Sequence, residues 1–295
     1  MIRRRSNPLQ SAAIATLATL LIGCGDCAPT AAIPALSQVA PKSTPTPRAE
    51  REVIRREWLI EGTLREALVS LPARTESDLS LSPIVFVFHG HGGGSAQVRR
   101  SYEAEQHWPE AIFAYPQGLP TPAALIDPEG RKPGWQRTDG EMDNRDLKLF
   151  DTMLADLISH SHADPLRVYA TGHSNGGSFT YLLWSTRHDA LAAVAPSASA
   201  AGQRVPLARP LPAMHVAGRR DALVKFEWQA RTMDRIRRLN GCTTSATPVG
   251  TSGNLYESSQ GAPTLLWITD ATHKFDASCV EEMMLFFRRY SRKGA

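Results

Sequence analysis

The residues with the clearest chemical potential form the segment Gly172-His-Ser-Asn-Gly176, which has the pattern Gly-x-Ser-x-Gly. Residues 167–170 before it are typical of a buried strand, and residues 178–184 after it are typical of a helix. A serine on such a sharp strand-to-helix turn projects its hydroxyl away from the backbone, where it can attack a carbonyl carbon. We therefore predict that Ser174 is a nucleophile. The alternative is an ordinary glycine-rich turn.

A serine hydroxyl needs a base that takes its proton, and the base needs an acid that orients it. On sheets with this kind of turn the chain order is serine, acid, histidine. After Ser174, one predicted strand leads into Asp221 and the last predicted strand leads into His273. The sequence thus predicts a triad in which Asp221 orients the ring and His273 is the base.

Each of these two assignments has an alternative. Asp221 could be a solvated loop residue or a helix cap, and His273 could be a surface histidine. His215 is another histidine in the region, but it lies inside an apolar strand and is more typical of a core residue. Asp270 is another acid, but it shares a short loop with His273 and is poorly placed to reach behind the ring.

Attack on a carbonyl creates an oxyanion, which backbone amides can stabilise. One donor is expected to be the amide of Asn175, at the start of the helix that follows the nucleophile. The second is expected from the glycine-rich loop 89–94, which follows the apolar run Ile84–Phe88. By position, the amide of His91 is the predicted donor, with Gly92 in reserve. The alternative for this loop is a simple anion-binding nest.

Strands and helices alternate along the predicted fold. This order indicates an α/β fold with a mainly parallel, twisted sheet and helices on both faces. In such sheets reactive residues lie at the carboxyl ends of the strands. The predicted strands cover residues 57–60, 64–71, 84–88, 111–115, 167–170, 191–195, 213–218 and 264–269, and the predicted helices cover 96–106, 145–159, 178–184, 227–239 and 280–290.

The N-terminal region has the pattern of an export signal. Arg3–Arg5 precede an apolar stretch of signal-peptide length, and the run Leu21-Ile-Gly-Cys24 resembles the bacterial lipobox. This predicts a signal peptide over 1–23, a lipidated Cys24, a tether over 24–52 rich in Pro, Ala, Ser and Thr, and a catalytic domain over 53–295. The alternatives are a plain secretory signal and a retained membrane helix.

Charge and cysteine content limit the classes of partner and cofactor. The formal net charge is +4, and without Arg3–Arg5 it becomes 4 − 3 = +1. We therefore expect no nucleic-acid partner. Cys242 and Cys279 are a candidate disulfide of an exported protein, the alternative being two free thiols. No cysteine or histidine spacing is typical of a zinc site, so we expect neither a metal nor a cofactor.

Six segments together resemble the polyhydroxybutyrate depolymerase and feruloyl esterase group of α/β-hydrolases. The resemblance extends over about residues 60–292. It implies the α/β-hydrolase fold, an esterase activity, and the roles given above for Ser174, Asp221, His273, His91 and Asn175. The His273 loop departs from the group because no glycine-rich run precedes it. The six segments are Pro83–Gly90, Tyr115–Leu119, Arg167–Gly177, Ala192–Pro196, Gly218–Asp221 and Ala271–His273.

The resemblance implies a serine esterase, and the N-terminal pattern predicts that it is secreted or lipid-anchored, in the cell envelope or outside the cell. Its substrates would be feruloyl or acetyl polysaccharide esters or hydroxyalkanoate oligomers, cleaved through an acyl-enzyme. Trp135 and His173 are candidates for the pocket wall; they could instead be a packing anchor and a loop contact. The chain is expected to be a monomer whose only membrane contact is its lipid. Alternative functions are a serine peptidase and a non-catalytic surface-binding lipoprotein.

Overall fold

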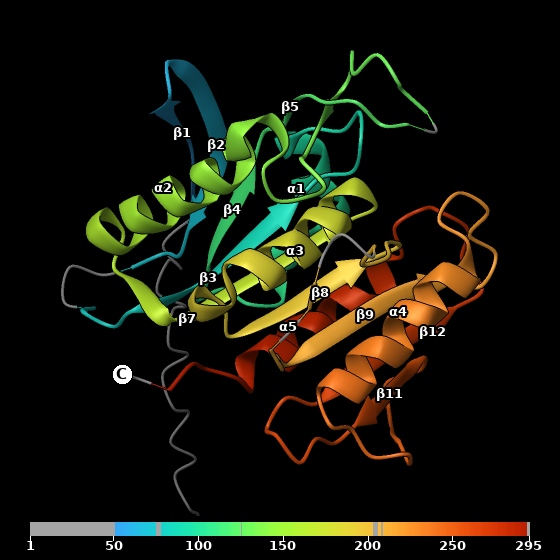
Figure 1. Cartoon of the computed structure of the whole chain (residues 1–295). Helices are drawn as coiled ribbons and strands as arrows, with labels where there is room; N and C mark the ends of the chain where they lie inside the picture. Colours follow the sequence, from blue (N-terminus) through green and yellow to red (C-terminus); the bar gives the residue numbers. More distant parts are fainter. Residues whose placement is uncertain (1–50, 75–77, 125, 203–205, 208, 294–295) are drawn as a thin grey trace, which may run out of the picture. The chain divides into compact units, whose positions relative to one another are not determined.

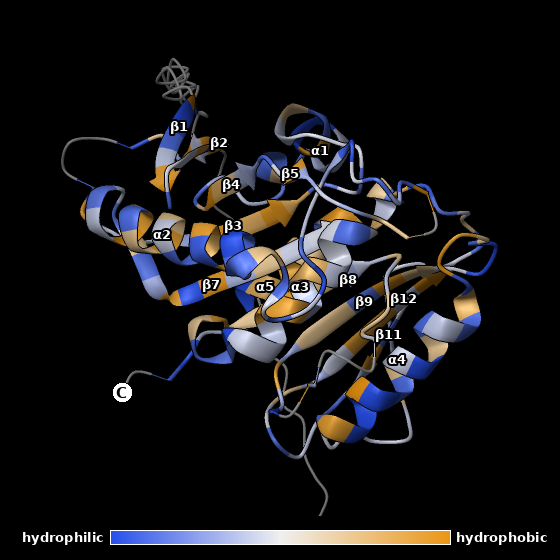
Figure 2. Cartoon of the chain, turned by 45° about the horizontal axis from the view of Figure 1, so that its top comes forward, coloured by the Kyte–Doolittle hydropathy of each residue, from blue (hydrophilic) through white to orange (hydrophobic). Residues whose placement is uncertain are grey.

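Strand β3 (Ser82–Phe88) lies in the interior of the fold, and all seven of its residues are buried. A computed structural model describes residues 51–74, 78–124, 126–202, 206–207 and 209–293. The predicted signal peptide, Cys24 and nearly all of the tether lie outside these residues. Figure 2 shows hydrophobic residues along β3, whereas hydrophobic and hydrophilic residues alternate around helix α2 (Arg145–His160).

The described residues form one large sheet with the strand order β1-β2-β4-β3-β7-β8-β9-β12-β11-β10. The six central strands are parallel, which confirms the predicted α/β architecture. The strands beside them are β1 (Glu52–Ile60), β2 (Thr63–Leu71), β10 (Thr247–Val249) and β11 (Gly253–Tyr256), and the other central strands are β4 (Ile112–Pro116), β7 (Ala163–His173), β8 (Ala193–Ser197), β9 (Ala213–Gly218) and β12 (Thr264–Thr269).

Helices cover both faces of this sheet (Figure 1). Helix α2 packs on one face, together with α3 (Asn175–Thr186) and α4 (Phe226–Leu239). Helices α1 (Ser95–Tyr102) and α5 (Val280–Arg288) pack on the other. Among the described residues, none of the helices combines the length and the apolar character that a membrane span requires.

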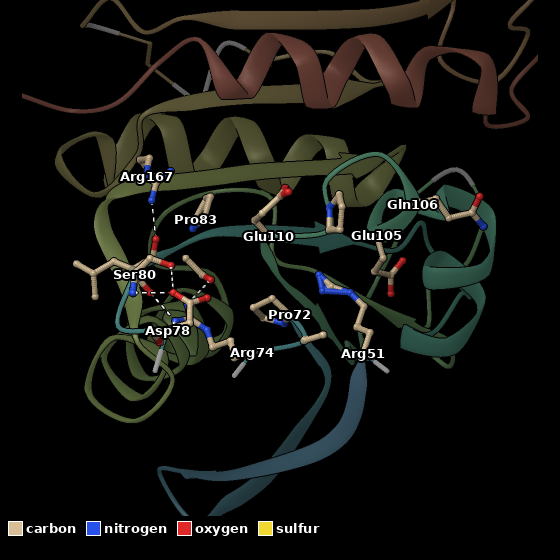
Figure 3. A pocket seen from close by; sticks show the side chains of 14 residues that line it. Arg51, Pro72, Arg74, Asp78, Ser80, Pro83, Glu105, Gln106, Glu110 and Arg167 are labelled. Atoms are coloured by element: carbon tan, nitrogen blue, oxygen red, sulfur yellow. Dashed lines mark hydrogen bonds between the residues drawn. The ribbon is translucent and has the colours of Figure 1, made fainter. Parts of the chain in front are cut away.

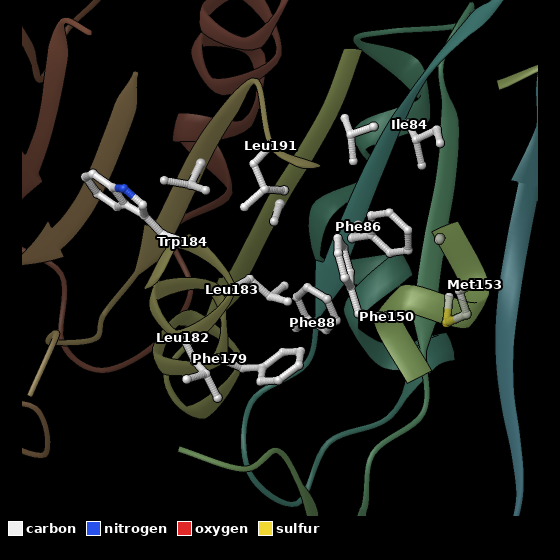
Figure 4. Close-up of a cluster of buried hydrophobic side chains, with 14 of the residues drawn as sticks. Ile84, Phe86, Phe88, Phe150, Met153, Phe179, Leu182, Leu183, Trp184 and Leu191 are labelled. Carbon is white, nitrogen blue, oxygen red and sulfur yellow. The ribbon is translucent and has the colours of Figure 1, made fainter. Parts of the chain in front are cut away.

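The core on the α2 and α3 face is rich in aromatic side chains. Phe86 and Phe88 of β3 contact Phe150 of α2 and Phe179 of α3, with ring centroids 4.8 and 4.9 Å apart respectively (Figure 4). Such tilted and edge-on pairs add to the stabilisation that burial gives. This packing fixes α3, and with it the turn that carries Ser174, against the central strand.

The structure differs from the predicted elements mainly at their ends. The helix predicted over 96–106 ends at Tyr102, because Glu103 adopts a left-handed conformation with a φ of 45°. The strand predicted over 191–195 is shifted to 193–197. Strands β10 and β11 were not predicted, because they are short and lack an apolar run. Residues 117–143, where no strand or helix is predicted, contain the short strands β5 (Leu119–Pro120) and β6 (Pro133–Gly134).

The predicted disulfide between Cys242 and Cys279 is wrong in this structure, where both residues are free thiols. Cys242 follows α4 on one side of the sheet, and its thiol donates to the Thr264 hydroxyl over 3.3 Å. Cys279 is buried in the core of the other face, where α5 begins. The sheet therefore separates the two sulfur atoms. Sequence spacing could not show this, because it does not tell on which face each helix packs.

Candidate active site

Ser174 occupies the sharp turn between β7 and α3. Its φ of 56° and ψ of −114° are unusual for a residue with a side chain. A Cβ atom on Gly172 would lie 2.6 Å from the backbone of Gly176, so only glycine fits beside the turn. The amide of Ser174 donates to the carbonyl of Ser197 at the end of β8 over 2.9 Å. The close packing at Gly172 and the hydrogen bond to β8 thus fix the turn.

The structure brings Ser174, His273 and Asp221 together. The Ser174 hydroxyl lies 2.8 Å from Nε2 of His273, and Nδ1 of the same ring lies 2.8 Å from a carboxylate oxygen of Asp221. The Asp221 side chain is fully buried, whereas the His273 side chain is 25% exposed. With Nδ1–H donated to the carboxylate, Nε2 is left to accept the serine proton.

Asp221 is held by its own loop and by α4. One carboxylate oxygen accepts hydrogen bonds from the amides of Leu223 and Val224, both over 2.9 Å. The other accepts from the side-chain amide of Gln229 over 3.2 Å, in addition to His273. These bonds fix the carboxylate in the orientation that the ring of His273 requires.

Gln229 connects Asp221 to the interior of the protein. Its amide oxygen lies 3.2 Å from Nε2 of His215, and Nδ1 of His215 lies 2.5 Å from the Tyr181 hydroxyl. Burial lowers the pKa of His215 to about 4, so its ring is neutral near pH 7. Both nitrogens of the buried His215 ring are engaged, since Nδ1 accepts from Tyr181 and Nε2 donates to Gln229, so neither contacts Ser174.

His173 lines the cleft beside Ser174 and also supports the His273 loop. Its Nε2 lies 2.9 Å from the backbone carbonyl of His273, and its Nδ1 lies 3.3 Å from the Ser197 hydroxyl. Burial, and after it the neighbouring His273, lower the pKa of His173 to about 4. The neutral ring can thus donate a hydrogen bond from Nε2–H to the His273 carbonyl and accept one from the Ser197 hydroxyl at Nδ1.

The two predicted oxyanion donors are near Ser174, but the reserve donor is not available. Gly92 donates its amide to the carbonyl of Pro133 over 2.7 Å, which overturns its reserve role. The amides of His91 and Asn175 donate to no other described residue. The His91 ring is fixed separately, with Nε2 3.0 Å from the Asp127 carboxylate.

Trp135 is a packing anchor, so the prediction that it lines the substrate pocket is wrong. Its side chain is fully buried, and its indole N–H donates to the carbonyl of His89 over 2.8 Å. Its ring packs between Phe88 and Phe179. The side chain of Asn175 exchanges two hydrogen bonds with the backbone of Trp135, over 2.7 and 3.0 Å. Trp135 thus joins the oxyanion loop to α3.

Sequence reasoning missed the residues that hold this loop. Nε2 of His89 accepts from the amide of Gly118 over 2.9 Å, and the side-chain oxygen of Gln117 accepts from the amide of Ser95 over 3.0 Å. Gln229 was missed as well. His89 and Gln117 lie inside the segments that carry the family resemblance, which is the only signal that could have found them. No local pattern marks Gln229.

Ser174 lies between two cavities that share several residues. The first has a volume of about 600 Å³ and reaches over His273, Lys274 and Phe275. The second, of about 170 Å³, reaches over Leu223 and Trp228. His91 lines both. This gives an ester room on either side of the serine.

A larger cavity of about 1020 Å³ lies away from the nucleophile, at the start of β3 and β7 (Figure 3). It contains Arg51, Arg74 and Arg167, each of which donates to an oxygen of another described residue. These arginines are therefore engaged in holding the surrounding loops. Neither a histidine nor a cysteine lines this cavity among the described residues.

Comparison with known proteins agrees with the geometry. Feruloyl esterase D of Neurospora crassa is 28% identical over 225 residues, which cover 72% of this chain and 72% of that protein. No family model matches the chain.

Solved structures show the same fold. A ferulic acid esterase from Anaeromyces mucronatus, in complex with ferulic acid, has a TM-score of 0.55 at 15% identity, over 84% of this chain and 93% of that one. An acetyl xylan esterase from Aspergillus awamori has a TM-score of 0.57 at 14% identity, over 79% of this chain and 99% of that one. The chain is therefore a serine hydrolase with the α/β-hydrolase fold. The relatives that it resembles in this class are a feruloyl esterase, a ferulic acid esterase and an acetyl xylan esterase.

Gln229→Leu tests whether Gln229 positions the carboxylate of Asp221. We expect kcat to fall by about ten- to hundredfold while KM changes little, because a misplaced carboxylate no longer orients the His273 ring. The pH dependence of kcat should shift as well, which a purely structural role would not cause. Gln106→Leu, an exposed residue elsewhere, is the matched control. Unchanged kcat in Gln229→Leu would contradict the role.

His215 makes folding stability depend on pH. Between pH 6.5 and about 4 the unfolded chain protonates this residue, whereas the folded chain does not. This group leaves the free energy of unfolding unchanged above pH 6.5 and lowers it by about 3 kcal/mol as the pH falls to about 4. Urea unfolding measures this effect. Between pH 6.5 and about 4, the free energy of unfolding of His215→Gln should decrease less than that of the wild type, by the same amount. Equal decreases in variant and wild type would refute this.

Proposed function

We propose that this protein hydrolyses carboxylic esters through an acyl-enzyme on Ser174, with His273 as general base and Asp221 as its orienting acid. The observation that carries the proposal is the continuous chain of two 2.8 Å contacts from the serine hydroxyl through the ring to the carboxylate. A hydroxyl, an imidazole and a buried carboxylate in this order are the parts that acyl transfer requires.

In the proposed first step, the oxygen of Ser174 attacks the ester carbonyl while Nε2 of His273 takes the hydroxyl proton. The amides of His91 and Asn175 stabilise the resulting oxyanion, and each such donor contributes about 3–4 kcal/mol. The Asp221 carboxylate stabilises the imidazolium without taking its proton. Collapse of the intermediate releases the alcohol, which receives its proton from His273.

In the second step, water replaces the alcohol. His273 takes a proton from the water, the water oxygen attacks the acyl carbonyl, and the acid product leaves as Ser174 regains its proton. The same two amides stabilise the second oxyanion. The half-buried cleft admits water to His273, whose side chain is partly exposed.

For the substrate we propose feruloyl or acetyl esters of polysaccharides, with hydroxyalkanoate oligomers as the other candidate. The named relatives support the first class, since they are feruloyl, ferulic acid and acetyl xylan esterases. The partly exposed ring of Trp228 in the cleft supports it too, because it offers an apolar face to an aromatic or sugar ring.

Covalent labelling tests the nucleophile. A fluorophosphonate probe should label the wild-type protein and should fail to label Ser174→Ala, because the probe reacts only with an activated serine. Hydrolysis of p-nitrophenyl acetate should fall by about 10⁴-fold or more in the same variant. Ser159→Ala, an exposed serine on α2, is the matched control and should keep both properties.

A substrate panel then separates the ester classes. It contains methyl ferulate, acetylated xylan, a hydroxybutyrate trimer and peptide amides. Turnover of the first two is the expected result, and turnover of the amides alone would replace the esterase by a peptidase. A native protein that neither reacts with the probe nor turns over any ester would refute the proposed function.

We also propose that the chain is exported and lipid-anchored through Cys24, on the basis of its N-terminal sequence. In a bacterial host, labelled palmitate should be incorporated into the wild-type chain and not into Cys24→Ser, because the thioether forms on that sulfur. Cys27→Ser is the matched control and should remain labelled. Incorporation into Cys24→Ser would contradict the proposal.

A further inference from the structure

A second group of residues continues the substrate cleft away from Ser174. A cavity of about 450 Å³ lies beside the one that contains the nucleophile and shares Arg137, Ala200 and Trp228 with it. Two further arginines, Arg231 and Arg235, line this outer cavity. None of the described residues that line either cavity is an aspartate or a glutamate.

The cleft follows one stripe of helix α4. Trp228, Arg231 and Arg235 are spaced i, i+3 and i+7, so they lie on the same side of the helix. With a rise of 1.5 Å per residue, the stripe extends over about 10 Å along the helix axis. It begins at the inner cavity, next to Ser174, and ends in the outer one. The stripe is therefore long enough to contact a substrate group that extends beyond the reacting ester.

The positive charges of Arg137 and Arg231 are not used to hold the fold together. Within the described chain, the guanidinium groups of Arg137 and Arg231 form no ion pair or hydrogen bond, and both residues are exposed. This differs from the cavity of Figure 3, whose arginines each donate to neighbouring oxygens. Glu227 precedes Arg231 by one helical turn, yet it lines neither cavity.

Cations also flank the other parts of the cleft. The ammonium of Lys225 lies 5.8 Å from the centre of the Trp228 ring, and Lys274 lines the cavity on the His273 side. No aspartate or glutamate is found among the described residues of that cavity either. An anionic group would therefore meet attraction, with no repulsion from a lining carboxylate.

We propose that the arginines Arg137, Arg231 and Arg235 form a subsite for a carboxylate on the ester substrate, with Trp228 supporting the part in between. The inference rests on the proposed esterase function and adds the charge of its substrate. Guanidinium groups bind carboxylates through paired, charge-assisted hydrogen bonds, so they suit this role. The substrate class is an ester that carries an acid, such as an acylated acidic sugar or a monoester of a dicarboxylic acid.

Paired substrates test the preference and locate the acid. The first pair places it on the acyl side: the mono-p-nitrophenyl ester of adipic acid and the same compound with its free acid methylated. The second pair places it on the alcohol side: a feruloylated uronic acid and its methyl ester. In one of the two pairs, we expect kcat/KM to be higher for the free acid than for its methyl ester. This difference should disappear at high salt, because salt screens the attraction. Equal or lower values for the acid in both pairs would overturn the subsite.

Variants connect the preference to the arginines. In Arg137→Gln/Arg231→Gln, the ratio of kcat/KM between acid and methyl ester should fall by about tenfold, since two charge-assisted contacts are lost. Arg289→Gln removes one exposed arginine at the end of α5 and should leave the ratio unchanged. An unchanged ratio in the double variant would refute the proposal.

A binding measurement separates this inference from the proposed function. Calorimetry with Ser174→Ala and the intact acidic esters requires no turnover. We expect binding of one acidic ester that is weakened about tenfold when Arg137→Gln and Arg231→Gln are added. If ester hydrolysis fails while this binding holds, the proposed function falls and the subsite stands. If hydrolysis holds while the acid binds no better than its methyl ester, only the subsite falls.

Discussion

The register of the parallel strands is the constraint on which the whole site depends. Phe88 at the end of β3 pairs with Gly172 at the end of β7, so the loop 89–94 and the turn with Ser174 leave the sheet at the same level. Gly218 of β9 pairs with Thr269 of β12 in the same way, and the loops with Asp221 and His273 follow directly. A shift of the strand register by one residue would turn the side chains at these strand ends to the opposite face of the sheet. The residues of the site would then be separated.

The sequence predicted most of what this register requires. Residues 213–218 and 264–269 form strands with the predicted bounds, because each apolar run ends at a glycine or polar residue. Contacts between distant side chains could not be predicted. Trp135 has an exposed-loop context in the sequence, yet Phe88 and Phe179 bury it. Gln229 lies in an ordinary helical pattern, and its contact with Asp221 depends on how α4 packs.

The net charge of the chain does not predict the charge of the cleft. A sum of +4 over the whole chain, or +1 without the first arginines, describes a protein near neutrality. The fold nevertheless gathers Arg137, Arg231 and Arg235 around one cavity, from a loop and a helix that are distant in the sequence. Acids such as Asp127 and Asp221 are nearby, but each accepts hydrogen bonds from backbone amides and other side chains. The positive charge of the cleft therefore results from the way the fold brings these segments together, and not from the net charge of the chain.

Helix α3, which starts directly after Ser174, is also connected to Asp221. Tyr181 belongs to α3, so the links from Tyr181 through His215 and Gln229 reach Asp221, and His273 returns to Ser174. Together with the helix backbone these links form a closed ring. Because the turn with Ser174 and the hydrogen-bond chain to Asp221 are both attached to α3, a change in the packing of that helix would reach the hydroxyl and the carboxylate together.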